Sequence, residues 1–243
     1  NLGDTAVGTA TVIANTSNYI SGNLTEIAAG KVGYIFSTNS TVNSEVLDTV
    51  GGIENVTGSA GIDYIVGSSG NNVLTGEAGA DYISAGAGAD TVTGGAGNDE
   101  ILLGAGDAVA DTVVHGTSTA ATAQSIGVAG AIAANDTITF GSGVDVVRNF
   151  DASMDLIDVT TDGTFASIIA QDSADLDELT TFFASGTFVE ATGVFTILAD
   201  GAGADTLIFE NEATAANDVL STMNNAMVLV GVDSDDLSTA DLI

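Results

Sequence analysis

The chain has 243 residues, of which 45% are hydrophobic, and a mean hydropathy of +0.37, so its composition excludes an intrinsically disordered chain. Its 33 acidic residues face only two basic ones, Lys31 and Arg148, and the formal net charge of −31 argues against binding to nucleic acid or to an anionic membrane. Cysteine is absent and His115 is the single histidine, which argues against disulfides and soft-metal sites and leaves oxygen ligands for a hard cation.

Residues 1–48 alternate threonine, valine and alanine, a pattern that predicts β-strands and contains no catalytic residue types. The first residue is Asn1 rather than methionine, so we expect the chain to be a piece of a longer protein. No apolar run approaches the roughly 20 residues that span a membrane. We therefore expect residues 1–48 to be a β-rich segment that continues from an upstream part.

Five nonapeptides follow one another without interruption from residue 58 to residue 102. Each has a glycine-rich turn, aspartate or asparagine at its sixth position and an aliphatic residue at its eighth. The five units are GSAGIDYIV, GSSGNNVLT, GEAGADYIS, AGAGADTVT and GGAGNDEIL. The preceding segment 49–57 keeps the pattern in part, with Glu54 at the sixth position. Consecutive copies in register predict a solenoid, in which each repeat stacks on its neighbours.

The repeat continues downstream with interruptions. Asp111 follows Asp99 after three extra residues, and Asp136 follows Asp111 after an insertion of sixteen. Asp145 then restores the nine-residue spacing. The inserted segment, at about 117–134, has low complexity and predicts a loop that leaves the stack.

These units resemble the hemolysin-type, or RTX, calcium-binding repeat G-G-x-G-x-D-x-U-x, in which U is a large aliphatic residue. The resemblance implies that each nonapeptide forms a turn and a short strand, and that two nonapeptides make one coil of a parallel β-roll. It therefore implies an all-β fold, with a calcium-binding β-roll over residues 49–148, flanking β-strands and a few short capping helices. The cofactor that it implies is Ca²⁺.

Two nonapeptides per coil place residues eighteen apart above each other, at a strand spacing of about 4.8 Å. Stacked carboxylates repel one another, whereas a calcium ion between successive turns would bind them together with backbone carbonyl oxygens. The alternative is a metal-free solenoid, in which the acidic side chains lie on the surface and bind no ion. One predicted column contains Asp63, Asp81 and Asp99, and the other Glu54, Asn72, Asp90 and Asp111. The candidate calcium ligands are Asp63, Asn72, Asp81, Asp90, Asp99, Asp111, Asp136, Asp145, Gly61, Gly79, Gly88 and Gly97.

Some repeats depart from the pattern. Asn72 keeps an oxygen ligand but lacks a charge, so its site should bind calcium less tightly. Ser59, Ser68 and Glu77 stand where the second glycine is expected, and Ala85 stands where the first is expected. Weak individual sites would still suit extracellular calcium, where binding modules commonly work at about 10⁻⁴ to 10⁻³ M.

Residues 149–243 are expected to form a C-terminal capping and secretion-signal region. The segment 145–159 resembles the one that closes the roll in secreted RTX proteins, and its acids could bind an end ion or form a solvated turn. The acids left undecided are Asp151, Asp155, Asp158, Asp200 and Asp205. A helix is predicted from Ser173 to Gly186, strands at about 187–199 and 205–210, a short helix at 215–226 and a last strand at 226–232.

The final residues, LVGVDSDDLSTADLI, resemble the uncleaved C-terminal signal of type I secreted RTX proteins. This resemblance implies a secreted, extracellular or cell-surface protein that is exported unfolded through type I secretion machinery and folds when it meets calcium outside. No nucleophile, base and orienting group can be assembled, and the GAGAD sequences at 86–90 and 201–205 do not complete a dinucleotide-binding motif. We therefore expect a protein that is not an enzyme.

The sequence is compatible with three functions. The first is a subunit or C-terminal fragment of a surface-layer lattice, since residues 1–48 resemble the neutral β-material of surface-layer proteins and large adhesins. The second is the end of a large adhesin, and the third is the non-catalytic calcium-folding tail of a secreted hydrolase. The expected partners are copies of the chain in a calcium-dependent assembly and, through an upstream part, cell-surface polysaccharide. Nucleic acid and membrane insertion are not expected.

Overall fold

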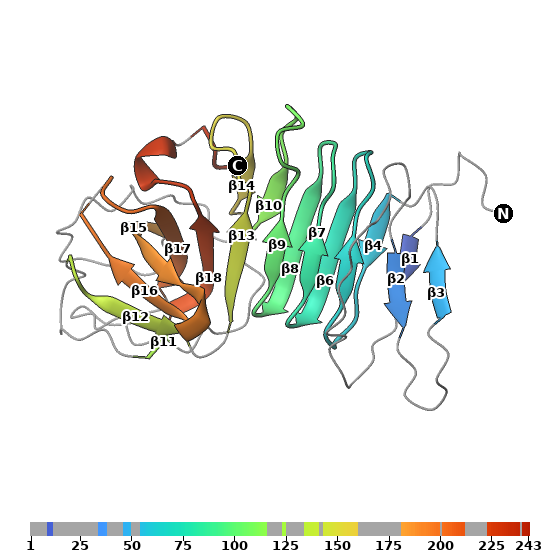
Figure 1. Ribbon diagram of the computed structural model, residues 1–243, viewed down its shortest axis with the longest axis horizontal. Coiled ribbons are helices and arrows are strands. Elements are labelled where there is room, and N and C mark those ends of the chain that lie inside the picture. The colour runs from blue at the N-terminus through green and yellow to red at the C-terminus, as the bar shows by residue number, and fades with distance from the viewer. Residues whose placement is uncertain are drawn as a thin grey trace.

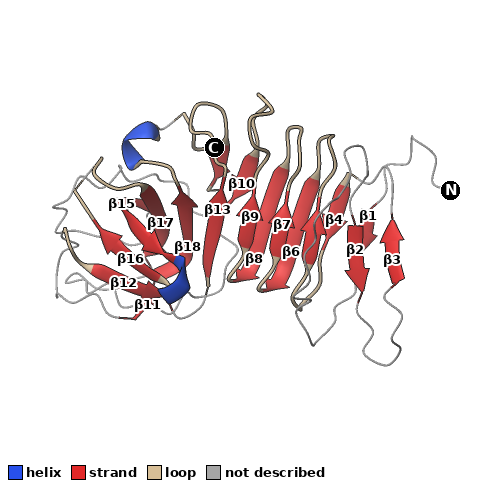
Figure 2. Cartoon of the chain, in the orientation of Figure 1, coloured by secondary structure: helices blue, strands red, loops and turns tan. Residues whose placement is uncertain are grey.

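A computed structural model gives the fold. Within the residues that it describes, the chain is almost entirely β-strand, and its helices are two short 3₁₀ segments, η1 (Glu190–Thr192) and η2 (Ser234–Asp236) (Figure 2). The described residues are 9–11, 34–37, 46–49, 54–115, 123–124, 134–140, 143–159, 181–199, 201–211, 223–238 and 240–243.

One face of the repeat region is a six-stranded parallel sheet. Its order is β1-β4-β6-β8-β10-β14, and neighbouring repeats pair with a shift of eighteen residues, so that Asn55 lies opposite Val73 and Val73 opposite Thr91. The strands are β1 (Thr9–Thr11), β4 (Asn55–Thr57), β6 (Val73–Gly79), β8 (Thr91–Gly97), β10 (Thr112–Val114) and β14 (Leu156–Asp158).

The alternate nonapeptides supply the second face. Tyr64 lies opposite Tyr82, their rings stack at 4.6 Å, and Tyr82 lies opposite Glu100, again eighteen residues on. This face contains β5 (Tyr64–Val66), β7 (Tyr82–Ser84), β9 (Glu100–Leu102) and β13 (Val144–Arg148), with β2 (Tyr34–Ser37) and β3 (Val46–Thr49) beyond β5. Figure 1 shows the strands as successive steps along the molecule. The predicted parallel β-roll with two nonapeptides per coil is confirmed.

The core of the roll comes from the eighth position of each repeat. In the short strands the central residue is buried and its two neighbours are half-buried, because side chains alternate between the two faces of a strand. The buried column of aliphatic residues contains Val56, Ile65, Leu74, Ile83, Val92, Ile101, Val113, Val147 and Ile157.

The second sheet of the roll continues into a C-terminal antiparallel sheet. Strand β13 pairs in parallel with β9 on one side and with β18 (Met223–Val230) on the other. Beyond β18 lie β17 (Asp205–Asn211), β15 (Thr181–Val189), β16 (Val194–Ile197), β12 (Thr137–Phe140) and β11 (Ala123–Gln124). A second hydrophobic cluster, which includes Phe195 and Phe209, packs there. Arg148 bridges Glu100 of the roll, at 3.4 Å, and Glu190 of the C-terminal part.

Two predicted helices are wrong where the structure describes them. Residues 181–186 belong to strand β15, and residues 223–226 belong to β18. The helical spacing of Leu176, Leu179 and Phe183 was misleading, because Phe182 and Phe183 pair across the sheet with β17 and favour a strand. The predicted helical residues 173–180 and 215–222 lie outside the described residues, as does most of the predicted loop at 117–134.

The limits of the roll also differ from those predicted. Asp136 and Ile138 were expected in a further repeat, but β12 pairs with β16 in the C-terminal sheet, so Asp136 is not part of either column. In contrast, β14 extends the first sheet of the roll beyond residue 148. The last residues of the chain cover the edge of β14, where the Ile157 N–H donates to the Asp241 carbonyl at 2.7 Å.

Candidate metal centre

The sixth-position side chains stack along one edge of the roll. The backbone N–H of Asp63 donates to Oδ1 of Asp81 at 2.7 Å, and the N–H of Asp81 donates to Oδ1 of Asp99 at 2.8 Å. The N–H of Asp99 then donates to Oδ1 of Asp145 at 3.1 Å. The structure therefore brings together the first column that the eighteen-residue period predicts, and adds Asp145 at its end.

A second column runs along the opposite edge. The N–H of Asn72 donates to Oδ1 of Asp90 at 2.7 Å, and the N–H of Asp90 to Oδ1 of Asp111 at 2.9 Å. The N–H of Asp111 reaches Oδ1 of Asp155, also at 2.9 Å. The sequence left Asp155 undecided, although an aliphatic residue two positions later, Ile157, keeps the spacing of the repeat.

Three carboxylates in the middle of these columns have one oxygen without a partner. Oδ2 of Asp81, of Asp90 and of Asp99 is buried and receives no hydrogen bond, and each residue is at most 2% exposed. Burying an ionised carboxylate without compensating contacts is costly. These atoms are therefore the strongest sign in the described residues that a cation belongs between the turns.

The electrostatics of these carboxylates agree with that conclusion. Burial raises the pKa of Asp81 to about 7, with further contributions from the Asp99 and Asp63 carboxylates. Burial likewise raises the pKa of Asp90 to about 7. Burial also raises the pKa of Asp99 and raises that of Asp145 well above its usual range. A divalent cation would reverse these shifts, because it stabilises the charged form.

Backbone oxygens complete the donor set. A Cβ at Gly76 would fall on Oδ2 of Asp81 and on the carbonyl oxygen of Gly94, in the turn one coil later. A Cβ at Gly94 would lie 2.6 Å from Oδ2 of Asp99. Glycine thus keeps free the space into which carboxylate and carbonyl oxygens point. An all-oxygen set of this kind fits Ca²⁺.

The ion would be held mainly by backbone. Among the described residues, no three His, Cys, Asp or Glu side chains cluster closely enough to hold a metal by themselves. Of the four predicted glycines, Gly79, Gly88 and Gly97 have φ of +144°, +109° and +154°, values that L residues rarely adopt. The carbonyl oxygen of Gly61 lies where a Cβ at Gly79 would be.

The other undecided acids that the structure describes lie outside the two columns. Both carboxylate oxygens of Asp205 accept backbone N–H bonds, from Phe188 at 2.8 Å and Gly231 at 2.9 Å, which makes Asp205 a structural residue of the C-terminal sheet. Asp158 accepts the N–H of His115 through its carbonyl oxygen. Asp200 lies outside the described residues.

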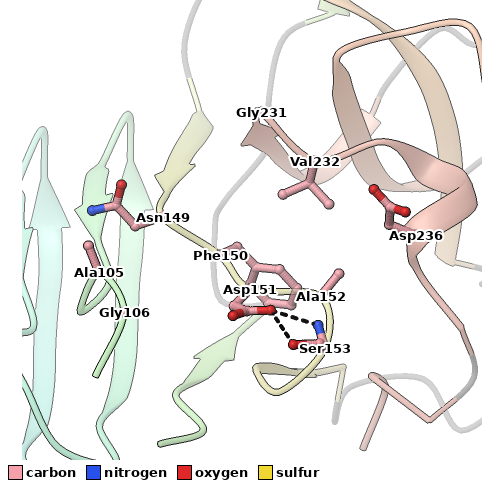
Figure 3. A pocket seen from close by; sticks show the side chains of 10 residues that line it. All are labelled: Ala105, Gly106, Asn149, Phe150, Asp151, Ala152, Ser153, Gly231, Val232 and Asp236. Carbon is pink, nitrogen blue, oxygen red and sulfur yellow. Dashed lines mark hydrogen bonds between the residues drawn. The ribbon is translucent and has the colours of Figure 1, made fainter. Parts of the chain in front are cut away.

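Asp151 is not in a column. It is exposed, and its Oδ1 accepts the N–H of Ser153 at 2.9 Å and the Ser153 hydroxyl at 2.5 Å, which lowers the pKa of Asp151. Asp151 lines an open cavity of about 580 Å³ at the end of the roll, with Phe150, Val232 and Asp236 around it (Figure 3). The column carboxylates do not line this cavity.

The raised pKa values predict how pH affects the metal-free roll. An unfolded aspartate has a pKa of about 3.9, so Asp81 and Asp90 take up protons on folding between about pH 4 and pH 7. In EDTA, we expect the metal-free roll to recover part of its β-structure as pH falls from about 8 to about 5, because protonation removes the buried charges. With calcium bound, the same acidification should lower the urea midpoint of unfolding, because protons compete with the ion. Circular dichroism in EDTA that shows less β-structure at about pH 5 than at about pH 8 would contradict the assigned burial.

The comparisons with known proteins agree with this geometry. Residues 49–83, 57–92 and 75–109 match the model of the RTX calcium-binding nonapeptide repeat (4 copies). The nonapeptides are therefore RTX calcium-binding repeats, and Ca²⁺ is their ion. No curated protein matches the chain. No helix in the described part of the chain is long and apolar enough to span a membrane.

Two solved structures are similar to the chain. The AlgE6R3 subunit of the Azotobacter vinelandii mannuronan C5-epimerase is 22% identical, with a TM-score of 0.43, and the match covers 75% of this chain and 78% of that one. The AlgE6R2 subunit of the same enzyme is 20% identical, with a TM-score of 0.41, over 73% of this chain and 90% of that one.

Proposed function

We propose that this protein is a calcium-dependent structural protein of the cell exterior, a subunit or C-terminal fragment of a surface-layer lattice. The observation that carries the proposal is the set of unpartnered buried oxygens on Asp81, Asp90 and Asp99. A roll with unpartnered carboxylates buried along its edge is rigid only when a cation binds them. Extracellular fluids contain calcium at concentrations that such sites can bind. Type I secretion before folding is part of the same proposal.

The charge of the chain supports a role for calcium between subunits as well as within them. At a net charge of −31, copies of the chain repel one another, and divalent ions would offset that repulsion at their contacts. The roll also presents regular sheets of stacked strands along the molecule (Figure 1), an arrangement that suits a repetitive lattice. In this proposal the chain performs no catalysis.

Assembly of the purified chain tests the proposal. We expect electron microscopy to show sheets or filaments after addition of millimolar calcium, and their loss after addition of EDTA. Magnesium at the same concentration is the matched control, because it prefers a tighter octahedral shell. A monodisperse monomer in calcium would reject the lattice and favour the end of an adhesin or the tail of a secreted hydrolase.

One substitution in each column tests the ligand assignment. We expect Asp81→Ala to weaken calcium binding by at least about tenfold, because it removes a full ligand charge. Asn72→Ala should have a smaller effect, because Asn72 is uncharged and its side chain is hydrogen-bonded to Ser68. Calorimetric calcium titrations of the two variants measure the difference. Equal losses would show that the two positions contribute alike.

A further inference from the structure

The turns of the roll have two conformations. In the turns at 76–81, 85–90 and 94–99, here called open turns, the second and fourth residues both have positive φ. In the turns at 58–63 and 67–72, here called closed turns, the same positions do not. The positive φ values are 78° at Glu77, 144° at Gly79, 101° at Gly86, 109° at Gly88, 106° at Gly95 and 154° at Gly97.

In each closed turn, the serine at the second position donates hydrogen bonds to the sixth-position side chain of the same turn. Ser59 donates to Oδ2 of Asp63 through its backbone N–H at 2.6 Å and its hydroxyl at 2.8 Å. Ser68 makes the same two bonds to Oδ1 of Asn72, at 2.7 and 3.3 Å. The sixth-position side-chain oxygen that has no hydrogen-bond partner in an open turn therefore already accepts hydrogen bonds in a closed turn.

Downstream of the open turns, backbone N–H groups of the same turn donate to the carboxylates of the second column. Oδ2 of Asp155 accepts the N–H of Asp151 at 2.8 Å, four residues earlier, as in the pair Ser59 and Asp63. Oδ2 of Asp111 accepts the N–H of Gly104 at 3.2 Å, seven residues earlier. The three extra residues in this turn account for the longer spacing. In the second column, the open turn at 85–90 is thus bounded on both sides by turns whose carboxylate or amide oxygens already accept hydrogen bonds.

We propose that calcium binding is confined to the three open turns, and that the closed turns are metal-free ends of the roll. The two donors from Ser59 occupy both lone-pair positions of Oδ2 of Asp63, and the two from Ser68 occupy those of Oδ1 of Asn72, so neither oxygen has a position left for a cation. Asp81, Asp90 and Asp99 are then the calcium carboxylates, whereas Asp63 and Asn72 are not. This inference rests on the proposed calcium-dependent function and assigns where within the roll the dependence lies.

A matched pair of isosteric substitutions tests the inference. Asp63→Asn should leave calcium stoichiometry and affinity within about twofold of wild type, because Asn72 already occupies the same place opposite Ser68. Asp81→Asn should remove one bound ion or weaken binding at least about tenfold. Isothermal titration measures both, and circular dichroism in calcium checks that each variant is folded. Equal losses from the two variants would overturn the inference.

The serine itself provides a second test that does not alter a carboxylate. Ser59→Gly restores glycine at the second position and removes one hydrogen-bond donor to Asp63. We therefore expect this variant to bind more calcium ions at saturation, or to bind calcium with higher affinity. Ser69→Gly is the matched control, since Ser69 is an exposed serine of the neighbouring closed turn. A Ser59→Gly variant that titrates like Ser69→Gly would overturn the role of Ser59. Absence of calcium binding by the wild-type chain would instead reject the proposed function.

Discussion

Removal of calcium with EDTA is expected to unfold the β-roll, and restoration of calcium is expected to refold it. Without the ion, the buried oxygens of Asp81, Asp90 and Asp99 have neither a hydrogen bond nor a counter-charge. Each site adds about 2.7 kcal/mol at a hundredfold excess of calcium over Kd, so three sites add about 8 kcal/mol. This sum is comparable with the whole stability of a domain, about 5–15 kcal/mol.

Circular dichroism and hydrogen exchange measure the effect. We expect loss of β-structure in EDTA and loss of amide protection first in β6, β7, β8 and β9, which flank the open turns. Because each coil contacts mainly its neighbours, unfolding should then spread along the roll. Magnesium should not substitute for calcium, since it demands a tighter shell. Unchanged spectra and protection in metal-free buffer would show that the columns are stable without an ion.

The substitution Gly97→Ala is expected to destabilise the calcium-loaded roll by about 3 kcal/mol or more. A Cβ at Gly97 would coincide with the carbonyl oxygen of Gly79 in the preceding coil, and the φ of Gly97 is +154°. Overpacking costs about 1–3 kcal/mol, and a backbone conformation that L residues avoid costs about as much again. A backbone oxygen cannot move aside without disturbing the paired strands.

Gly70→Ala is the matched control, since Gly70 holds the same fourth position in a closed turn. The nearest atom to a Cβ there is the Ser68 hydroxyl, at 3.8 Å, which is ordinary contact. We expect a change within about 0.5 kcal/mol for Gly70→Ala. Urea unfolding of both variants in calcium compares them. Similar midpoints for the two variants would show that the open turns tolerate a side chain.

The repeat itself determined much of this protein. A strict period of nine, with an acid at the sixth position and an aliphatic residue at the eighth, predicts the parallel pairing of Val73 with Thr91, the buried Ile83 and Ile101, and the column of Asp81 and Asp99. The period is sufficient because each coil repeats the same local geometry, so one register satisfies every turn and every core position together.

Tertiary structure alone decided what happens where the period ends. Asp145 and Asp155 join the columns from 46 and 44 residues beyond their partners, and β15 becomes a strand because β16 and β17 pair with it. The difference between open and closed turns also appears only in the backbone angles and the hydrogen bonds of Ser59 and Ser68. The columns beyond Asp99 and Asp111 and strand β15 depend on contacts between distant segments, which a local pattern of residues does not specify. The Ser59 and Ser68 bonds are local, but they depend on a backbone conformation that the repeat pattern does not specify.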